Sequence, residues 1–386
     1  MNERKPKPGW KMVRFGGIAQ NIVERIDPAN ARTDVYVGLE HLDPTTLHLR
    51  RWGHPRDVSG EKLVFQKGDI IFGKRRAYQR KLALAKFDGI CSAHAMVLRP
   101  HPKLVLPEFF PFFLQSSAFM DRAVEISVGS LSPTINWGTL RDQEFALPPI
   151  EEQKRISEVL WAADEAAEDS GEALSKMNNL LTIQADRLTR ELPTRHNAAL
   201  AEISRFGEII TGTTPSTSYP DYWGGTIPFV TPADISEFDV FVNTTERFVT
   251  ELGSQVGRKV PGNSVAVTCI ASIGKIGIIR QESITNQQIN SIVCSGGNSP
   301  IYLYFALLSH MSLIRSFAGA TAVPIINKKT FGSIRIPKPE TGYQETVASK
   351  LMSVYDCIQQ AKANEDNLRR LCEQLNEEYL RGESHV

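Results

Sequence analysis

The sequence has few cysteines, and they form no Cys-x-x-Cys pair. All five lie in apolar runs, at Cys91, Cys269, Cys294, Cys357 and Cys372. This spacing argues against a disulfide or zinc framework, and we expect reduced, mostly buried thiols. The eight histidines are also scattered without ligand-like spacing, so we predict that this chain holds no metal.

Long apolar runs are absent as well. No stretch approaches the roughly 20 residues that a membrane-spanning helix needs. The Lys-rich start, residues 1–11, is not followed by the apolar core of a signal peptide. We therefore predict a cytoplasmic protein without a membrane partner.

The common catalytic motifs are missing. Gly274 and Lys275 are followed by Ile276, so they do not form a Walker A loop. The sequence has no HExxH zinc helix, no GxSxG nucleophile elbow and no Gly-rich dinucleotide fingerprint. The single Pro-Pro pair, at residues 148–149, lacks the flanking residues of an amino-methyltransferase motif. We therefore expect neither catalysis nor a bound cofactor in this chain.

The chain has almost no net charge, +1 in total, but the charges are segregated. Residues 1–150 carry 22 Lys and Arg against 15 Asp and Glu, whereas residues 151–192 carry 5 against 10. Residues 193–340 carry 12 against 10, and residues 341–386 carry 5 against 8. A basic globule of this kind can present a local patch to phosphate, while the acidic blocks should face something other than nucleic acid.

The chain contains an internal repeat. The run KGDIIFGKRRAYQRKLALAKFDGI at residues 67–90 aligns with PGNSVAVTCIASIGKIGIIRQESI at residues 261–284. Two further pairs of segments, YVGLEHL with FVTPADI and SPTINWGTL with VPIINKKTF, follow the same order at nearly the same offset. Three matches in order are much stronger than one, and we predict two copies of one module.

A long helix is predicted to follow each copy. Residues 150–192 and 341–382 contain apolar positions at alternating spacings of four and three, which is a heptad seam. Pro193 should end the first helix, and Thr341 with Gln344 resembles a capping box for the second. The apolar seam positions are Ile156, Leu160, Leu174, Met177, Leu181, Leu188, Val347, Leu351, Val354, Ile358, Leu368, Leu375 and Tyr379.

We expect these two helices, each about 60 Å long at 1.5 Å per residue, to pair with one another. Two similar modules can pair about a pseudo-twofold axis, which makes the helices antiparallel. The simpler alternative is that each helix packs only on its own globule. The pairing hypothesis gives an α+β fold with two similar domains, residues 1–149 and 193–340, separated by two antiparallel coiled-coil helices that act as a ruler.

Short runs rich in Ile and Val and punctuated by Gly predict strands in each domain, with helices over residues 106–119 and 300–317. In the first domain, the segment GKRRAYQRK places five basic side chains and a tyrosine between two apolar strands. Such runs also form solvated hairpins, but in a basic domain we interpret this one as a DNA contact. Its residues are Lys74, Arg75, Arg76, Tyr78, Arg80 and Lys81.

The second domain keeps only Lys275 of that set, so the two domains should read different sequences. Asn and Gln amides can pair with adenine, although the TNQQIN segment is at least as typical of a capped turn. The aromatic pair Tyr222 and Trp223 is more typical of a loop anchor than of a base-stacking surface. The predicted DNA contacts here are Thr213, Thr214, Lys275, Gln287, Gln288, Asn290, Lys328 and Lys329.

The sequence resembles the specificity subunits of Type I restriction-modification systems over nearly its whole length. The most specific matches are TGTTPSTSYPDYWGGTIPFVTPADI at residues 211–235, SIGKIGI at 272–278 followed by TNQQIN, and LPPIEEQKRI at 147–156. The second linker, IPKPETGYQETV, departs somewhat from LPPIEEQKRI, and this departure puts only docking detail in doubt.

This resemblance implies a non-catalytic subunit that recognises an asymmetric bipartite site on double-stranded DNA. It also implies two modification subunits, which bind S-adenosylmethionine and methylate adenine N6, docked mainly on the helices. Two restriction subunits, which use ATP and Mg²⁺, can join such a complex.

Three alternatives remain at this stage. The chain could serve a methyltransferase-only or Type IIB-like system, which neighbouring genes would distinguish. A coiled-coil adaptor for other proteins would bind no DNA even with a methyltransferase present. An enzyme with a dispersed active site would be revealed by methyl transfer by the isolated chain.

Overall fold

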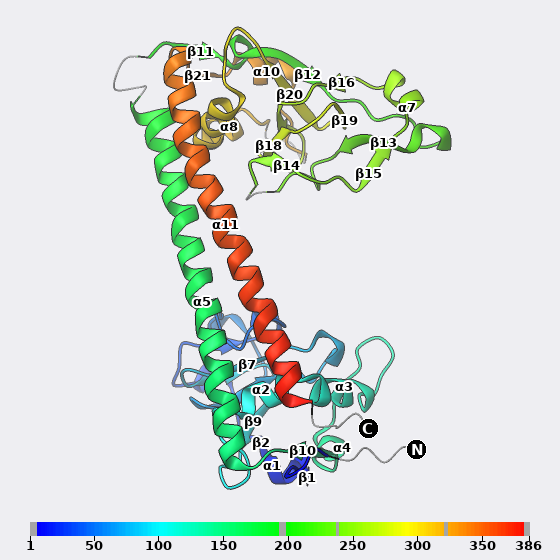
Figure 1. Ribbon diagram of the computed structural model, residues 1–386, viewed down its shortest axis with the longest axis vertical. Coiled ribbons are helices and arrows are strands. Elements are labelled where there is room, and N and C mark those ends of the chain that lie inside the picture. Colours follow the sequence, from blue (N-terminus) through cyan, green and yellow to red (C-terminus); the bar gives the residue numbers. More distant parts are fainter. Residues whose placement is uncertain (1–5, 193–197, 237–238, 320–322, 382–386) are drawn as a thin grey trace. The chain divides into compact units, whose positions relative to one another are not determined.

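The computed structural model describes residues 6–192, 198–236, 239–319 and 323–381. The chain forms two compact units (Figure 1). Unit 1 comprises Met1–Ser170 with Asn364–Val386, and unit 2 comprises Gly171–Ala363. Each unit therefore combines one predicted domain with half of each predicted spacer helix. Among the described residues, no helix has the length and apolar character to cross a bilayer.

Unit 1 contains two four-stranded sheets and a two-stranded ribbon. The sheets have the orders β2-β9-β6-β7 and β3-β5-β8-β4, and β1 pairs with β10. The strands are β1 Lys11–Arg14, β2 Ala19–Ile22, β3 Arg25–Ile26, β4 Tyr36–Val37, β5 Lys62–Phe65, β6 Ile70–Phe72, β7 Leu82–Leu84, β8 Gly89–Cys91, β9 Met96–Pro100 and β10 Glu144–Leu147. The short helices are α1 Phe15–Ile18, α2 Phe110–Gln115, α3 Ser117–Glu125 and α4 Trp137–Arg141.

Unit 2 repeats this plan with an additional strand at one sheet edge. Its sheets have the orders β12-β20-β17-β18-β14 and β15-β13-β19-β16, and β11 pairs with β21. The strands are β11 Leu200–Glu202, β12 Gly207–Thr211, β13 Trp223–Val230, β14 Phe241–Val242, β15 Arg247–Val249, β16 Lys259–Val260, β17 Val265–Thr268, β18 Ile276–Ile279, β19 Ser283–Thr285, β20 Ile289–Cys294 and β21 Arg335–Pro337. The short helices are α7 Glu251–Val256, α8 Pro300–Ser309, α9 Met311–Ser316 and α10 Lys328–Ser333.

The strand pairing confirms that the two halves are copies of one module. Tyr36 pairs in parallel with Ile90, and Phe229 pairs in parallel with Ile284, at the offsets that the sequence alignment predicts. Both pairs belong to the second sheet of their unit, in which a parallel pair lies among antiparallel neighbours. The predicted mixed α/β fold class, with an internal repeat, is therefore confirmed.

A buried glutamine at the start of each long helix also repeats. The Gln153 amide donates to Leu104 O and Pro148 O, at 2.9 and 3.0 Å. The Gln344 amide donates to Pro339 O at 2.9 Å, and its oxygen accepts from Ser299 N. Gln344 thus ties the helix start to the globule, and this is a different role from the predicted capping box.

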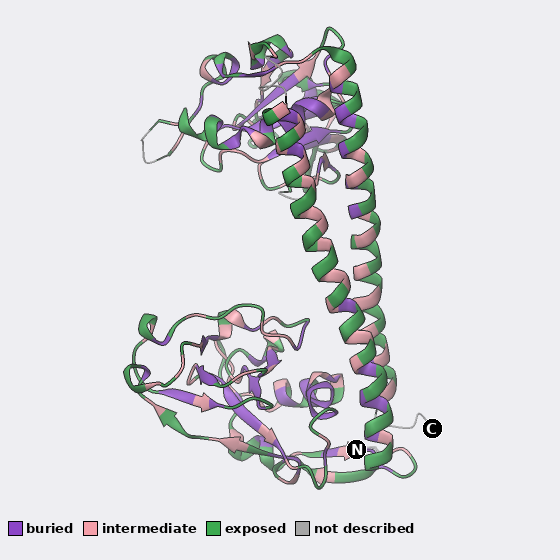
Figure 2. Cartoon of the chain, turned by 90° about the vertical axis from the view of Figure 1, so that its left-hand side faces the viewer, coloured by how far each residue is buried: buried purple, intermediate pink, exposed green. Residues whose placement is uncertain are grey.

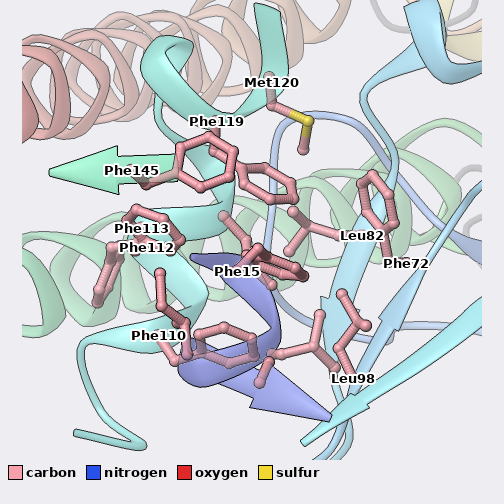
Figure 3. Close-up of a cluster of buried hydrophobic side chains, with 14 of the residues drawn as sticks. Phe15, Phe72, Leu82, Leu98, Phe110, Phe112, Phe113, Phe119, Met120 and Phe145 are labelled. Carbon is pink, nitrogen blue, oxygen red and sulfur yellow. The ribbon is translucent and has the colours of Figure 1, made fainter. Parts of the chain in front are cut away.

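The core of unit 1 is rich in phenylalanine (Figure 3). The Phe15 ring lies 5.2 Å from that of Phe119 and 5.9 Å from that of Phe145, and all three side chains are buried. The single helix predicted over residues 106–119 is interrupted here. Ser116 ends α2, and its hydroxyl caps α3 by accepting from Phe119 N. In unit 2, His310 separates α8 from α9 without a side-chain cap, so both expected helices are broken.

The two long helices are α5, Ile150–Asp186, which continues as a π-helical turn through Glu191, and α11, Thr341–Leu380. Each of the thirteen predicted apolar seam residues is buried or half-buried, as the stripes along both helices illustrate (Figure 2). The position of Pro193 lies outside the described residues.

Within each unit, the helices pair in opposite directions. In unit 1, Ile156 and Leu160 near the start of α5 share a core cluster with Leu375, near the end of α11. In unit 2, Leu181 and Leu188 near the end of α5 share a cluster with Val347 and Leu351, near the start of α11. Because the same clusters contain globule residues, the helices pack both on one another and on the globules.

The thiol prediction is only partly correct. Cys91 and Cys269 are buried in sheets, and burial raises the pKa of the Cys91 thiol to about 12. Cys294 and Cys372 are half-buried, and Cys357 is exposed. Cys357 and Cys372 lie on α11, which is covered on only one side, so an apolar run in the sequence did not guarantee burial there.

Candidate nucleic-acid interface

The basic segment of unit 1 is a loop held in a fixed shape between β6 and β7. Its backbone is attached to residues 133–135, because Arg76 N donates to Pro133 O at 2.7 Å and Ile135 N donates to Lys74 O at 3.0 Å. Arg76 and Arg80 adopt left-handed backbone conformations, with φ of 57° and 50°. Such angles are uncommon for non-glycine residues and often accompany functional sites. They flank a 3₁₀ turn at Ala77–Gln79.

Positive charges concentrate at one end of this loop. The Arg75 guanidinium lies 3.3 Å from His94 Nε2. Burial, followed by the charges of Arg75, Lys74 and Lys62, lowers the pKa of His94. Burial, followed by the charge of Arg25, lowers the pKa of Lys74. The neighbouring cations are the second cause in both cases, and several cations near one another favour an anionic partner such as phosphate.

The predicted contacts in this loop divide into two groups. Arg75, Arg76 and Tyr78 are exposed, and Lys74 is half-buried at the edge of the same surface. The Arg80 guanidinium is paired with the Asp121 carboxylate, so part of its charge is already matched.

Lys81 and Lys275 perform the same structural task. The Lys81 ammonium donates to Leu39 O at 3.0 Å, and the Lys275 ammonium donates to Pro232 O at 3.0 Å. Both are half-buried, and both fix the segment that follows the parallel strand of their module. Their matching positions in the sequence repeat reflect this shared hydrogen bond to a backbone carbonyl. Their assignment as DNA contacts stays a prediction without support from the geometry.

The corresponding loop of unit 2 has the same attachment but lacks cations at the positions of Lys74, Arg75 and Arg76. Ala271 N donates to Pro324 O at 3.0 Å, and Ile326 N donates to Cys269 O at 2.8 Å. Ala271, like Arg76, has a positive φ, here 61°. The backbone is therefore repeated, while the cations of unit 1 are replaced by Cys269, Ile270 and Ala271.

The threonines and glutamines of unit 2 come together at one loop cluster. The Thr214 hydroxyl donates to Gln287 Oε1, and Arg258 N donates to Thr213 Oγ1 at 2.9 Å. Gln287 and Thr214 are exposed, so their remaining hydrogen-bonding capacity faces outwards. Gln288 N donates to Asn286 Oδ1 at 3.1 Å, which is the turn-capping role that we considered as an alternative.

Asn290 is not available to a base, in contrast to our prediction. Only 3% of the residue is exposed, and its Oδ1 accepts from the Thr211 hydroxyl at 2.6 Å. Position 290 lies in β20, an interior strand of its sheet whose residues 289–292 are all buried. Lys328 and Lys329, by contrast, are exposed at the start of α10, where Asn327 caps the helix.

Trp223 is the loop anchor that its sequence context predicts. Its ring lies 5.0 Å from that of Phe229 in an edge-to-face arrangement, and the Arg247 guanidinium stacks 3.6 Å above it.

His94 is a candidate that the sequence reasoning missed. It is exposed beside Arg75 and occupies the position equivalent to Gln288 in the repeat. The equivalence is visible in the backbone, since Ser92 N donates to Val37 O and Asn286 N donates to Val230 O. Extending the sequence alignment by a few residues beyond Ile90 would have identified it.

In each unit, side chains of the globular part contact a long helix, but the type of contact differs between the units. In unit 1, His48 Nε2 and the Asp164 carboxylate are 2.6 Å apart, and Arg50 pairs with Glu168. Burial alone would raise the pKa of Glu168, but Arg50, His48 and Arg369 hold it below its usual range. In unit 2, the equivalent contact is aromatic, with the ring centroids of Phe241 and Tyr355 6.4 Å apart.

The repeated modules, the paired helices and the crowded cations on an anchored loop place the chain in the class of modular DNA-binding proteins. Among the described residues, no group of His, Cys, Asp or Glu has a metal-binding arrangement. Residues 55–172 and 199–370 match the model of the Type I restriction modification DNA specificity domain. The chain therefore belongs to this family, and its part in a Type I restriction-modification system is DNA sequence recognition.

Similar proteins span nearly the whole chain. It is 24% identical over 431 residues to the HindI specificity subunit of Haemophilus influenzae, covering 90% of this chain and 93% of that protein. It is 21% identical over 380 residues to the putative MjaX specificity subunit of Methanocaldococcus jannaschii, covering 90% and 86%. The Type I restriction-modification S subunit from M. genitalium shares the fold with a TM-score of 0.58 at 13% identity, covering 100% and 98%. A chain from a structural study of type I complex assembly and conformational transition does so with a TM-score of 0.61 at 20% identity, covering 98% and 99%.

Proposed function

We propose that this chain recognises an asymmetric bipartite DNA site, with one half-site read by each unit, and that it performs no catalysis itself. The observation that carries the proposal is the repeated loop between β6 and β7 and between β17 and β18. Its backbone attachment is the same in both units, but Lys74, Arg75 and Arg76 in unit 1 are replaced by uncharged residues in unit 2. Equivalent loops with different side chains should select different base sequences.

The two units should also bind with different balances of charge. In unit 1, Lys74, Arg75, Arg76 and His94 offer contacts to phosphate and guanine. In unit 2, Thr214 and Gln287 offer uncharged hydrogen-bonding groups, with Lys328 and Lys329 exposed on α10. We expect the half-site of unit 1 to contribute more of the salt dependence.

We further propose that catalysis resides in partner subunits. Two modification subunits would bind S-adenosylmethionine and methylate adenine N6, and two restriction subunits using ATP and Mg²⁺ could join them. The long helices suit such docking, because they expose acidic side chains such as Glu158, Glu172 and Asp366. Because such a complex would act on DNA inside the cell, we also propose that this chain works in the cytoplasm.

The remaining alternatives differ in their observable consequences. A methyltransferase-only or Type IIB-like system would share the DNA-reading role and differ only in partner genes. A protein-binding adaptor would tolerate replacement of Arg75 and Arg76. The cations beside His94 favour DNA over the adaptor, because several positive side chains on one exposed loop suit a polyanion.

A pH experiment tests the assignment of this surface to DNA. The pKa of His94 is lowered by burial and by Arg75, Lys74 and Lys62, so the side chain is mainly neutral at pH 7.5 in the free protein. A nearby phosphate would raise that pKa, and binding would then take up a proton. We expect the affinity of the assembled complex for target DNA to rise about three- to tenfold as the pH falls from 7.5 to 6.0.

The matched control is His94→Gln, which introduces the residue found at the equivalent position in unit 2. Fluorescence anisotropy at fixed ionic strength should show that this variant loses most of the pH dependence and binds within about twofold of the natural protein at pH 7.5. Identical pH profiles for the two proteins would show that His94 does not lie against phosphate.

A further inference from the structure

An apolar loop tip stands beside the basic loop of unit 1. Leu131 is 92% exposed and Val128 is 66% exposed, and Leu131 is the most exposed large apolar side chain among the described residues. Single exposed apolar residues are ordinary on protein surfaces. Two on one short loop, directly beside a cluster of cations, form a more specific arrangement.

The tip is fixed relative to those cations by backbone hydrogen bonds. Val128 and Thr134 exchange a pair of bonds, at 3.0 and 2.9 Å, which closes the loop of residues 128–134. The base of this loop is joined to the basic segment, because Arg75 and Thr134 form a β-bridge and Arg76 N donates to Pro133 O. The apolar tip and the cations of Arg75 and Arg76 therefore belong to two loops that are joined at their bases.

Unit 2 also exposes apolar side chains beside its anchored loop, although that loop lacks the three cations of unit 1. Ile270 and Ile325 form the bridge equivalent to that of Arg75 and Thr134. The basic side chains are absent there, yet Val323 and Ile325 remain 49% and 48% exposed. Exposed apolar side chains thus accompany the anchored loop in both units, although at different positions, because Val323 and Ile325 align with Ser132 and Thr134.

Building on the proposed function, we propose that Leu131 makes an apolar contact with the bases of the first half-site. The neighbouring cations identify the partner, since Lys74, Arg75 and Arg76 favour a polyanion. Within duplex DNA, apolar surface is offered by thymine methyl groups in the major groove and by base faces at an opened step. Leu131 is therefore a further specificity-determining residue, beside cations that offer contacts to phosphate and guanine.

The test measures DNA affinity and its salt dependence with the complex of this chain and its modification subunits. We expect Leu131→Ala to weaken binding to target DNA about tenfold, whereas Leu131→Met stays within about twofold. The slope of affinity against salt should be unchanged, because no cation is removed. Met12→Ala, which trims another exposed apolar side chain of unit 1, is the matched control and should have no effect.

Two modified duplexes distinguish a contact with a thymine methyl group from a contact with base faces at an opened step. If Leu131 contacts a thymine methyl, one thymine-to-uracil change in the first half-site weakens the natural complex and does not further weaken Leu131→Ala. If Leu131 enters an opened step, 2-aminopurine at that step brightens on binding, and the variant abolishes the signal. Unchanged affinity of Leu131→Ala, an altered salt slope, or a loss of affinity without either base signal would overturn the proposal. Failure of the natural complex to bind specific DNA would instead reject the proposed function.

Discussion

Replacing Lys74, Arg75 and Arg76 with glutamine is expected to abolish recognition of one half-site while the complex still assembles. Arg75 and Arg76 are exposed and Lys74 is half-buried on the same anchored loop, so their loss removes the main positive charge of that surface. We expect a fall in affinity for the full target of at least about 100-fold at moderate salt, and a salt slope smaller by up to about three. Competition binding against targets mutated in either half-site measures the effect.

The competition has a specific expected result. The variant should no longer distinguish an intact first half-site from a scrambled one, but should still distinguish the second. The charge-matched control replaces Arg14, Lys103 and Arg141, three exposed cations elsewhere in unit 1, with glutamine and should keep both preferences. Unchanged affinity for target DNA in the loop variant would reject the role of these residues, and loss of assembly would indicate a structural role instead.

Inserting four residues into α5 after Ser170 is expected to change the gap between the half-sites and leave their sequences unchanged. Four residues add about one helical turn, roughly 6 Å, which corresponds to about two base pairs at roughly 3.4 Å each. The loops between β6 and β7 and between β17 and β18 are far from the insertion in the sequence. Their backbone hydrogen bonds do not involve α5 and should stay intact. Methylation mapping of the modified complex reads both the gap and the half-sites.

A second variant controls for damage to the helix pairing. Because four residues shift the heptad phase of α5, we also propose seven-residue insertions after Ser170 and after Ala363, which restore the phase in both helices. Seven residues add about 10 Å, and the gap should lengthen by about three base pairs. A gap that stays the same in both variants would defeat the idea that the helices set the spacing.

The repeat and the helices were predictable because their signals are periodic. The constant offset between segments and the spacing of residues such as Ile156, Leu160, Val347 and Leu351 can be read without knowing the fold. The interruptions at Ser116 and His310 were not predictable from the apolar pattern, because it continues through both positions.

The site was only partly predictable, because strand pairing decides which side chains face outwards. Arg75 and Arg76 stood out as charges between apolar strands, and the structure exposes them. Asn290 looked similar to Gln287 in the sequence but faces the interior of the sheet. The matching positions of Lys81 and Lys275 in the repeat reflect a bond to a carbonyl in the segment that follows a distant strand, which no local pattern reveals.

The most direct test of the central claim is to express this chain with its neighbouring methyltransferase subunit in a host free of DNA methylation and to map modified bases by long-read sequencing. The account predicts N6-methyladenine in one asymmetric motif whose two half-sites are separated by a fixed gap. A stable complex that leaves the genome unmodified would contradict DNA recognition and favour a protein-binding adaptor.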